Sequence, residues 1–505
     1  MKPLGTITKY FPFLEEEITK NLTSLMQDSL HYSDFLDRVV EQVMNNESSQ
    51  MMVLFAVVHL YYTDRLGDLE SILKKYHELK LVLPYIKELG LSTQEATIDD
   101  VFQSVEEILR TTKSPWVVFE MHRLRLLCAA TNSLGSPIEQ DAMVHIQNLI
   151  DSTSGMDCFR PILLRLQASR LHQEGSISVA ISHIEASRVQ SLSCDDLYGL
   201  YDTYIALAYS LRNLDTKKAH EMLNKANDLM KLLGFDAEKD WGYHNIRASV
   251  HNARGEYSLS MELYDIAIRC RESQRIYHSL RFLPINVSFL YSELEDGENA
   301  LEWAKMAMES RSFLSNHPTF KATTLTRMAR ALVLLGDIEQ AEMYLNQSET
   351  ESLKTGSESI IAENLIVAGH IEKAKGNLAD AMYHFERGLE VAEKINYQNR
   401  INSCLIGLVK SEIAMLESTD ATALLERSGP WMKLLQAETD KKDLPGIQGI
   451  LLLLKTDLRL KQGRKDEANE LLKEIRSIAK KPGLSYLNDK ADDLQKKCDL
   501  LEKEE

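Results

Sequence analysis

Residues 255–267, GEYSLSMELYDIA, contain the spacing that decides the fold. After Gly255 come an aromatic residue at offset two, a small residue at offset five, an aromatic residue at offset nine and a small residue at offset twelve. Residues four and seven positions apart lie on one face of an α-helix, so Ser260, Tyr264 and Ala267 share a face. The glycine before them gives the backbone freedom that a tight turn needs. The stretch therefore predicts the turn and second helix of a helical hairpin, whose small residue lets the first helix approach closely.

The same spacing returns at 336–348, 376–388 and 463–475. The small residue of each second helix falls at Ala142, Ala180, Ala219, Ser260, Ala300, Ala341, Ala381, Ala421 and Ala468. Neighbouring positions in this series are 38 to 41 residues apart, except for a last interval of 47. A single hairpin cannot bury its apolar stripe, whereas stacked hairpins can. The sequence therefore predicts a stacked array of about nine hairpins.

At 255–267 the spacing is similar to the signature of the tetratricopeptide repeat (TPR) family, with Ser260 where alanine is usual. Ala248, Ala329 and Gly369 fall where that family has a small residue in its first helix. The period of about 40 residues exceeds the usual 34 and resembles the long-period repeats of MalT-type sensor regions and Rap regulators. The resemblance covers roughly residues 115–480. It implies an all-α, right-handed superhelical α-solenoid of TPR-like helix-turn-helix hairpins.

Three regions are expected along the chain. Residues 1–114 are helical by pattern but less regular, and they form either a cap of divergent repeats or a separate binding module. Residues 115–480 form the solenoid, with a degenerate unit near Ala421 where Gly429-Pro430 and residues 444–446 (Leu-Pro-Gly) interrupt helix continuity. Residues 481–505 are polar and charged, which suits a terminal capping helix.

The composition excludes several classes of protein. The 505 residues are 44% hydrophobic and 26% charged, which argues against disorder. The net charge of −17 disfavours general nucleic-acid binding. The longest apolar run, 51–62, has too few residues for a membrane span, and the first residues lack an apolar signal core. Six scattered cysteines predict reduced thiols and a cytoplasmic protein without a zinc site: Cys128, Cys158, Cys194, Cys270, Cys404 and Cys498.

No pattern of catalytic residues or of cofactor ligands is present. The sequence has no phosphate-binding glycine loop, no HExxH zinc motif and no GxSxG nucleophile motif. His244 and His251 lie seven residues apart with Glu256 nearby, but we favour a packed or solvated pair over a metal site. A tyrosine cluster at 198–209 is likewise more typical of helix packing than of a ligand-facing wall. We expect no catalytic residue, no metal and no cofactor.

The resemblance also places the first helix of each hairpin on the concave surface of the superhelix. Carried over to this sequence, it puts these residues on or beside the groove: Arg165, Ser169, His172, Asn245, Ser249, Asn252, Asn286, Thr326, Arg327, Arg330, Glu363, His370 and Lys373. Arginine, lysine and asparagine side chains suit an extended or helical segment that carries carboxylates. The alternative is that these residues are polar only because the helix face meets solvent.

Three functions follow from these observations. The first is a non-enzymatic interaction scaffold that holds a peptide segment or partner protein in the groove. The second is a regulatory sensor whose repeats bind a small effector or peptide and change conformation. The third, which we favour least, is an enzyme with an unfamiliar site in residues 1–114. A protein or peptide partner is expected, with no nucleic acid and no membrane span.

Overall fold

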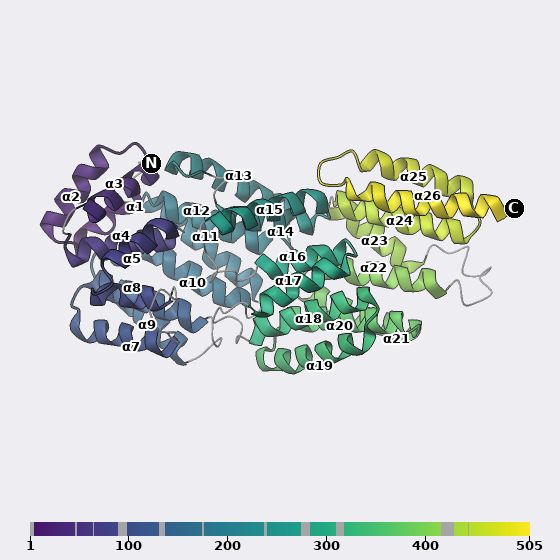
Figure 1. Cartoon of the computed structure of the whole chain (residues 1–505), viewed down its shortest axis with the longest axis horizontal. Coiled ribbons are helices and arrows are strands. Elements are labelled where there is room, and N and C mark those ends of the chain that lie inside the picture. The colour runs from purple at the N-terminus through teal and green to yellow at the C-terminus, as the bar shows by residue number, and fades with distance from the viewer. Residues whose placement is uncertain are drawn as a thin grey trace.

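The structure is a computed structural model of the whole chain (Figure 1). It describes residues 5–45, 48–63, 65–88, 98–130, 137–173, 176–236, 240–273, 283–309, 318–415, 429–442 and 444–504. Within these ranges the regular elements are all helices, so the predicted all-α class is confirmed. None of the helices described is long and apolar enough to cross a membrane.

The helices follow one another along the chain. The N-terminal region contains α1 (Gly5–Thr8), η1 (Phe11–Phe13), α2 (Glu16–Gln27), α3 (Tyr32–Asn45), α4 (Gln50–Tyr62), α5 (Leu66–Lys75), η2 (Lys80–Val82), α6 (Leu83–Glu88) and α7 (Ile98–Thr111). The first half of the solenoid contains α8 (Pro115–Ala130), α9 (Pro137–Ser152), η3 (Met156–Phe159), α10 (Arg160–Gln173), α11 (Ile177–Ser193), α12 (Leu197–Leu211), α13 (Thr216–Leu233), α14 (Trp241–Ala253) and α15 (Tyr257–Ser273). The second half contains α16 (Leu283–Glu293), α17 (Gly297–Glu309), α18 (Pro318–Leu335), α19 (Ile338–Thr355), α20 (Glu358–Ala374), α21 (Leu378–Lys394), α22 (Gln398–Met415), α23 (Pro430–Lys442), α24 (Pro445–Lys461), α25 (Lys465–Ile478) and α26 (Tyr486–Glu504).

Consecutive helices from α8 to α25 pack as hairpins, as the TPR-like spacing predicts. The small residue that marks each second helix is fully buried at Ala142, Ala180, Ala219, Ser260, Ala300, Ala341, Ala381 and Ala468. Ala421, the remaining member of the series, lies outside the described residues. Because a larger side chain at these positions would push the paired helices apart, the repeat spacing directly encodes the hairpin packing.

The turn before the second helix has left-handed backbone at the predicted glycines. Gly336 and Gly376 have φ angles of 80° and 84°, which side chains with a Cβ rarely adopt. In the α16–α17 hairpin the equivalent position, five residues before Ala300, is Glu295, with a φ of 65°. A non-glycine residue in this conformation is uncommon and prompts a search for what holds it there.

The superhelix closes on itself, because α14 and α15 contact the C-terminal helices. The amide N–H of Gly446 donates to the carbonyl of Arg254 over 3.1 Å, and that of Ser258 donates to Gly483 over 3.0 Å. A Cβ on Gly446 would lie 2.1 Å from the carbonyl oxygen of Gly255, so this close approach requires glycine. Segments about 190 to 230 residues apart in the sequence are therefore in direct contact.

The N-terminal helices share one hydrophobic core with the first solenoid hairpins. The ring of Tyr10 packs edge-on against Phe55, Trp116 and Phe159, with centroid distances of 5.2 to 5.7 Å. Aromatic edge-to-face packing of this kind adds stability beyond the area that it buries. The expected boundary at residue 114 therefore does not divide the apolar core.

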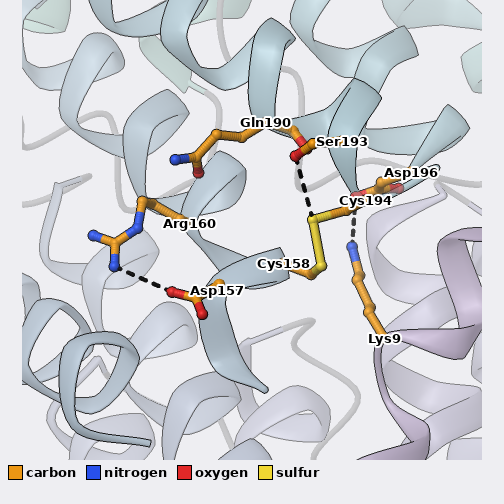
Figure 2. Close-up of a disulfide and its surroundings, with 8 residues drawn as sticks. All are labelled: Lys9, Asp157, Cys158, Arg160, Gln190, Ser193, Cys194 and Asp196. Atoms are coloured by element: carbon orange, nitrogen blue, oxygen red, sulfur yellow. Dashed lines mark hydrogen bonds and ion pairs between the residues drawn. A yellow bond between two sulfur atoms is a disulfide. The ribbon is translucent and has the colours of Figure 1, made fainter. Parts of the chain in front are cut away.

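Two cysteines form a disulfide, which corrects the expectation of six reduced thiols (Figure 2). Cys158 in η3 and Cys194 after α11 are 36 residues apart in sequence, and their Cα atoms lie 5.7 Å apart. The α10–α11 hairpin runs out and back and so brings its two ends together, which cysteine spacing alone does not reveal. Cys128, Cys270, Cys404 and Cys498 are buried and take no part in this disulfide.

Candidate functional site

Six of the thirteen predicted groove residues are buried instead of lying on an open surface. Residues less than a tenth exposed are Asn245, Ser249, Asn252, Thr326, Arg327 and Glu363. Asn252 lies beside α22 and α24, and Glu363 contacts Arg400 of α22. Ser249 and Thr326 instead face second helices of the hairpins, where they bond Tyr264 of α15 and Ser348 of α19. The expectation that this face is open to solvent is therefore wrong for these six residues. Their polarity needs another explanation.

The polar residues of the inner face and the ring of Phe289 form several small sets of ion pairs, hydrogen bonds and ring contacts, which together we call the axial network. It consists of Asn245, Asn286, Phe289, Glu293, Arg327, Arg330, Glu363, Asn364, Gln398, Arg400 and Asn402. These residues come from the first helices of five successive hairpins, α14, α16, α18, α20 and α22. First helices stack along the solenoid, so residues one period apart meet on its inner face.

Glu363 lies at the centre of the axial network and pairs with two guanidinium groups. Arg327 Nη2 donates to Glu363 Oε2 over 3.1 Å, and Arg400 contacts the same carboxylate. The ring of Phe289 lies against both cations, with 4.5 Å between its centroid and Arg327 Cζ and 5.1 Å to Arg400 Cζ. Burial disfavours the charged carboxylate, but the two arginines outweigh it and hold the pKa of Glu363 below its ordinary value. One carboxylate therefore neutralises only part of the charge around it.

A second ion pair and an amide contact extend the network. Arg330 Nη2 lies 3.3 Å from Glu293 Oε1, and the Tyr257 hydroxyl donates to the other oxygen of Glu293 over 3.3 Å. Asn286 Nδ2 donates to Asn245 Oδ1 over 3.1 Å. Of the predicted groove residues, Asn286 therefore contacts Asn245, whereas Arg327 and Arg330 pair with Glu363 and Glu293.

The axial network has more hydrogen-bond donors than acceptors. The hydroxyls of Thr326 and Ser348 each lie 2.7 to 2.9 Å from both the Ala322 carbonyl and Asn364 Oδ1, whereas Asn364 Nδ2 has no partner among the residues described. Among the residues described, five buried donor atoms of the network have no hydrogen-bond partner: Arg327 Nε, Arg330 Nε, Asn364 Nδ2, Arg400 Nε and Asn402 Nδ2. Only one acceptor atom of the network, Gln398 Oε1, is buried without a donor among the residues described. Each buried unpaired polar group costs about 1–3 kcal/mol, so this surplus favours acceptors from elsewhere.

The space beside the network is small in this closed conformation. A cavity of about 10 Å³ lies between α14, α16, α22 and α24, lined by Asn252, Tyr257, Phe289, Glu293 and Asn402 among others. A cavity of this size holds about one water molecule. A peptide can therefore reach the network only if the turn opens.

The remaining groove candidates lie in other surroundings. Ser169 is exposed on α10, and His172 is half-buried beside the Tyr209 ring. Burial and the nearby Arg212 lower the pKa of His172 to about 3. The ring of His370 packs edge-on against Phe385. Lys373 is half-buried, and its burial together with the nearby Lys410 lowers its pKa to about 8.

Arg165 belongs to a separate cluster, which we call the N-terminal polar cavity. This cavity of about 30 Å³ is lined by Lys9, Tyr10, Tyr32, His59, Arg123, Arg165, Asp196 and Asp202 among others. Here each cation has its own carboxylate: Lys9–Asp196 at 2.6 Å, Arg123–Glu120 at 3.5 Å and Arg165–Asp202 at 3.3 Å. The Lys9–Asp196 pair lies beside the disulfide (Figure 2).

The carboxyl groups of this cavity differ in pKa. Burial raises the pKa of Asp202 to about 6, although Arg165 and Arg123 oppose the shift. For Asp196, the attraction of Lys9 overcomes burial and lowers the pKa. Burial lowers the pKa of His59 to about 3, so its ring is neutral and shares a hydrogen bond with the Tyr32 hydroxyl at 2.5 Å. The cavity is thus a charge-balanced part of the core.

His251, considered above for a metal site, instead shares a 2.5 Å hydrogen bond with Glu256. Within the described ranges, no three His, Cys, Asp or Glu side chains are grouped so that they could hold a metal ion.

The resemblance to TPR repeats, which placed the predicted groove residues, did not identify Phe289, Arg400 or Asn402. A signal for Arg400 was present, because Arg327, Glu363 and Arg400 follow one another at intervals of 36 and 37 residues, about one repeat. The predicted groove residues ended at Lys373 because the next hairpin, near Ala421, departs from the repeat spacing.

No protein-family model matches the sequence, and no curated protein matches it. Solved structures with a related helix arrangement include a Rap protein complexed with competence and sporulation factor, at 13% identity and a TM-score of 0.47. That alignment covers 68% of this chain and 99% of the other. The APC/C hetero-tetramer Cut9-Hcn1 aligns at 14% identity and a TM-score of 0.43, over 87% and 75% of the two chains. The apo form of the quorum sensor NprR from B. thuringiensis aligns at 13% identity and a TM-score of 0.34, over 81% and 99%. Because these scores lie below 0.5, the fold assignment rests on the helix pairing described above.

Proposed function

We propose that this protein is a non-enzymatic scaffold or regulator that binds a peptide segment of a partner along its axial network. The surplus of buried donors supports this proposal. Arg327, Arg330 and Arg400 share two carboxylates, and five network donors have no acceptor among the residues described. A peptide supplies backbone carbonyls and carboxylates, which are the acceptors that such a surface lacks.

The sensor alternative is favoured by the way the turn is closed. Glu295, the residue with left-handed backbone, pairs with Lys410 of α22 at 2.9 Å and with Lys490 of α26 at 2.5 Å. We call these two ion pairs the Glu295 clasp. It joins three helices that must separate before a peptide can enter. A ligand that binds only the open form would shift the population toward that form.

The experiment starts with peptides selected from a displayed random library against the full chain. Their affinities are then measured by titration calorimetry for wild type and for Asn364→Asp/Asn402→Asp. This double substitution removes two surplus donors but keeps the oxygen that lies beside the hydroxyls of Thr326 and Ser348 and the one that accepts from Gln398. The variant cannot make the hydrogen bonds from these two donors to the carboxylates of the peptide. Because hydrogen bonds to charged groups contribute about 1.5–3 kcal/mol, we expect peptide affinity to fall at least about tenfold.

The matched control is Asn224→Asp/Asn346→Asp, which makes the same chemical change at two exposed positions. It should bind the selected peptides as wild type does. An equal loss in both variants would attribute binding to overall charge, and full retention in the network variant would refute the axial site.

A further inference from the structure

A second concave surface lies away from the axial network, between α23 and α24. Its volume is about 370 Å³, against about 10 Å³ for the axial cavity, so it accommodates side chains without any opening of the turn. The lining residues are Met432, Lys433, Gln436, Lys455, Leu458 and Arg459. We call this surface the α23–α24 groove.

The floor of the groove is apolar and fixed. Met432 and Leu458 are 5% and 8% exposed and belong to the hydrophobic core that α20 to α24 share. Such a floor keeps its shape when a ligand arrives. Methionine is unbranched and polarizable, so it adapts to aliphatic side chains of different shapes. The floor therefore suits one aliphatic side chain.

The walls of the groove are basic. Lys455 Nζ donates to Gln436 Oε1 over 2.7 Å, whereas Arg459 pairs with Glu467 at 2.8 Å. Neither Lys433 nor Lys455 pairs with a carboxylate in the part of the chain that the structure describes. The groove presents positive charge without a built-in counter-charge.

We propose that the α23–α24 groove docks an acidic segment of a partner protein. An aliphatic side chain of that segment would rest on Met432 and Leu458, and carboxylates on either side of it would pair with Lys433 and Lys455. Charge complementarity selects this occupant, and the apolar floor selects a peptide over a purely charged ligand. A nucleic acid is disfavoured because a sugar-phosphate backbone offers no aliphatic side chain to the floor formed by Met432 and Leu458. This proposal is independent of the axial site.

The test uses a fluorescein-labelled peptide in which leucines alternate with pairs of glutamates. Its binding to the full chain is followed by fluorescence anisotropy at low and high salt. We expect binding that weakens with salt, and a loss of about tenfold in Lys433→Glu/Lys455→Glu, because two pairs worth up to about 1 kcal/mol each become repulsive. Lys433→Glu alone, at an exposed position, should give part of the loss even if Lys455→Glu disturbs folding.

The matched control is Lys480→Glu/Lys481→Glu, which makes the same charge change at exposed positions outside the groove. Wild-type affinity in this control supports the groove. An equal loss in the control, no loss in the groove variants, or undiminished binding of a peptide with glutamine in place of glutamate would overturn the proposal. The Asn364→Asp/Asn402→Asp variant should bind this peptide normally, which separates the result from that of the axial site.

Discussion

The axial network and the N-terminal polar cavity are both buried and polar, but their charges are arranged differently. In the cavity, Lys9, Arg123 and Arg165 each have a carboxylate of their own. In the network, three arginines share Glu293 and Glu363, and the leftover donors point to no acceptor that the structure describes. The difference teaches that buried polarity alone does not mark a binding site. A mismatch between donors and acceptors is the more informative property.

The packing around the N-terminal polar cavity also differs from the packing around the axial network. The cavity lies within the largest apolar core, where aromatic rings from the N-terminal helices and the first hairpins interlock. The network lies where distant parts of the superhelix meet, and half-exposed ion pairs at Glu295 help to hold that contact. The first arrangement favours one rigid state, and the second favours a closed state that can open.

The largest effect is expected at the shared carboxylate. Glu363→Gln leaves Arg327 and Arg400 buried without a counter-charge, and breaking a buried pair in this way costs about 3–5 kcal/mol. Urea unfolding followed by circular dichroism measures the loss. Arg400→Met in the Glu363→Gln background should recover part of it. If Glu363→Gln unfolds like wild type, Glu363 does not hold the network together.

The disulfide should contribute the next largest effect, and only to stability. Linking residues 36 positions apart restricts the unfolded chain and stabilises the native state by about 3 kcal/mol. Cys158→Ser/Cys194→Ser should unfold at correspondingly lower urea but bind axial peptides with wild-type affinity. A changed peptide affinity would contradict the view that the N-terminal polar cavity contributes to stability and the axial network to binding. Thiol counting under denaturing conditions, before and after reduction, shows whether the bond is present in the purified protein.

The cavity can be tested through its most buried carboxylate. Asp196→Asn removes the partner of Lys9 but keeps a side chain that caps α12. We expect a loss of about 3 kcal/mol, because Lys9 stays buried without its counter-charge. The folded-state pKa of Asp196 is lowered, so its contribution is present above the unfolded value of about 3.9 and disappears as pH falls below it. The difference in unfolding free energy between wild type and variant should therefore shrink in acid. A difference that stays constant with pH would show that the pair does not stabilise the fold electrostatically.

Substitution of Glu295 should change the free energy of unfolding least. Its effect on peptide affinity should nevertheless be clear. Glu295→Gly relieves left-handed strain worth about 1–2 kcal/mol but loses two half-exposed ion pairs worth about 0–1 kcal/mol each, so the net change stays within about 1 kcal/mol. Peptide affinity should nevertheless rise, because the open state is reached more easily. Glu295→Gln, which keeps the strain and removes the charge, should also bind more tightly.

Acid should have the same effect as these substitutions. Lys410, with burial opposing it, lowers the pKa of Glu295 to about 2. The clasp therefore stabilises the closed state above about pH 4.5 and is lost as pH falls toward 2. Small-angle scattering should show the radius of gyration of wild type rising toward that of Glu295→Gly as pH falls, whereas Glu295→Gly itself should change less over the same range. Identical profiles would show that Glu295 does not control closure.

Much of the fold was predictable because its determinants are local and repeated. Ser260, Ala341 and Ala381 are buried where the spacing places them, and Gly336 and Gly376 have the expected left-handed backbone. These features depend on residues within one hairpin. The same spacing predicted which helix of each hairpin carries Asn245, Asn286, Arg327 and Arg330, whereas their role in binding stays a prediction.

The rest depends on contacts between distant segments. The Gly446–Arg254 and Ser258–Gly483 bonds close the turn and bury the inner face, and no hairpin on its own indicates them. For the same reason the sequence assigned Arg165 to the groove, although its helix packs against α12 and its guanidinium bonds Asp202 and the Gly199 carbonyl.

The most direct test of the axial site is photo-crosslinking of a selected peptide that carries a benzophenone beside its carboxylate. Mass spectrometry then identifies the residues that the probe attacks. The account predicts crosslinks to inner-face residues of α16, α18, α20 and α22, and their loss in Asn364→Asp/Asn402→Asp. Crosslinks confined to the outer helices, or to the α23–α24 groove, would contradict the axial network as the binding site.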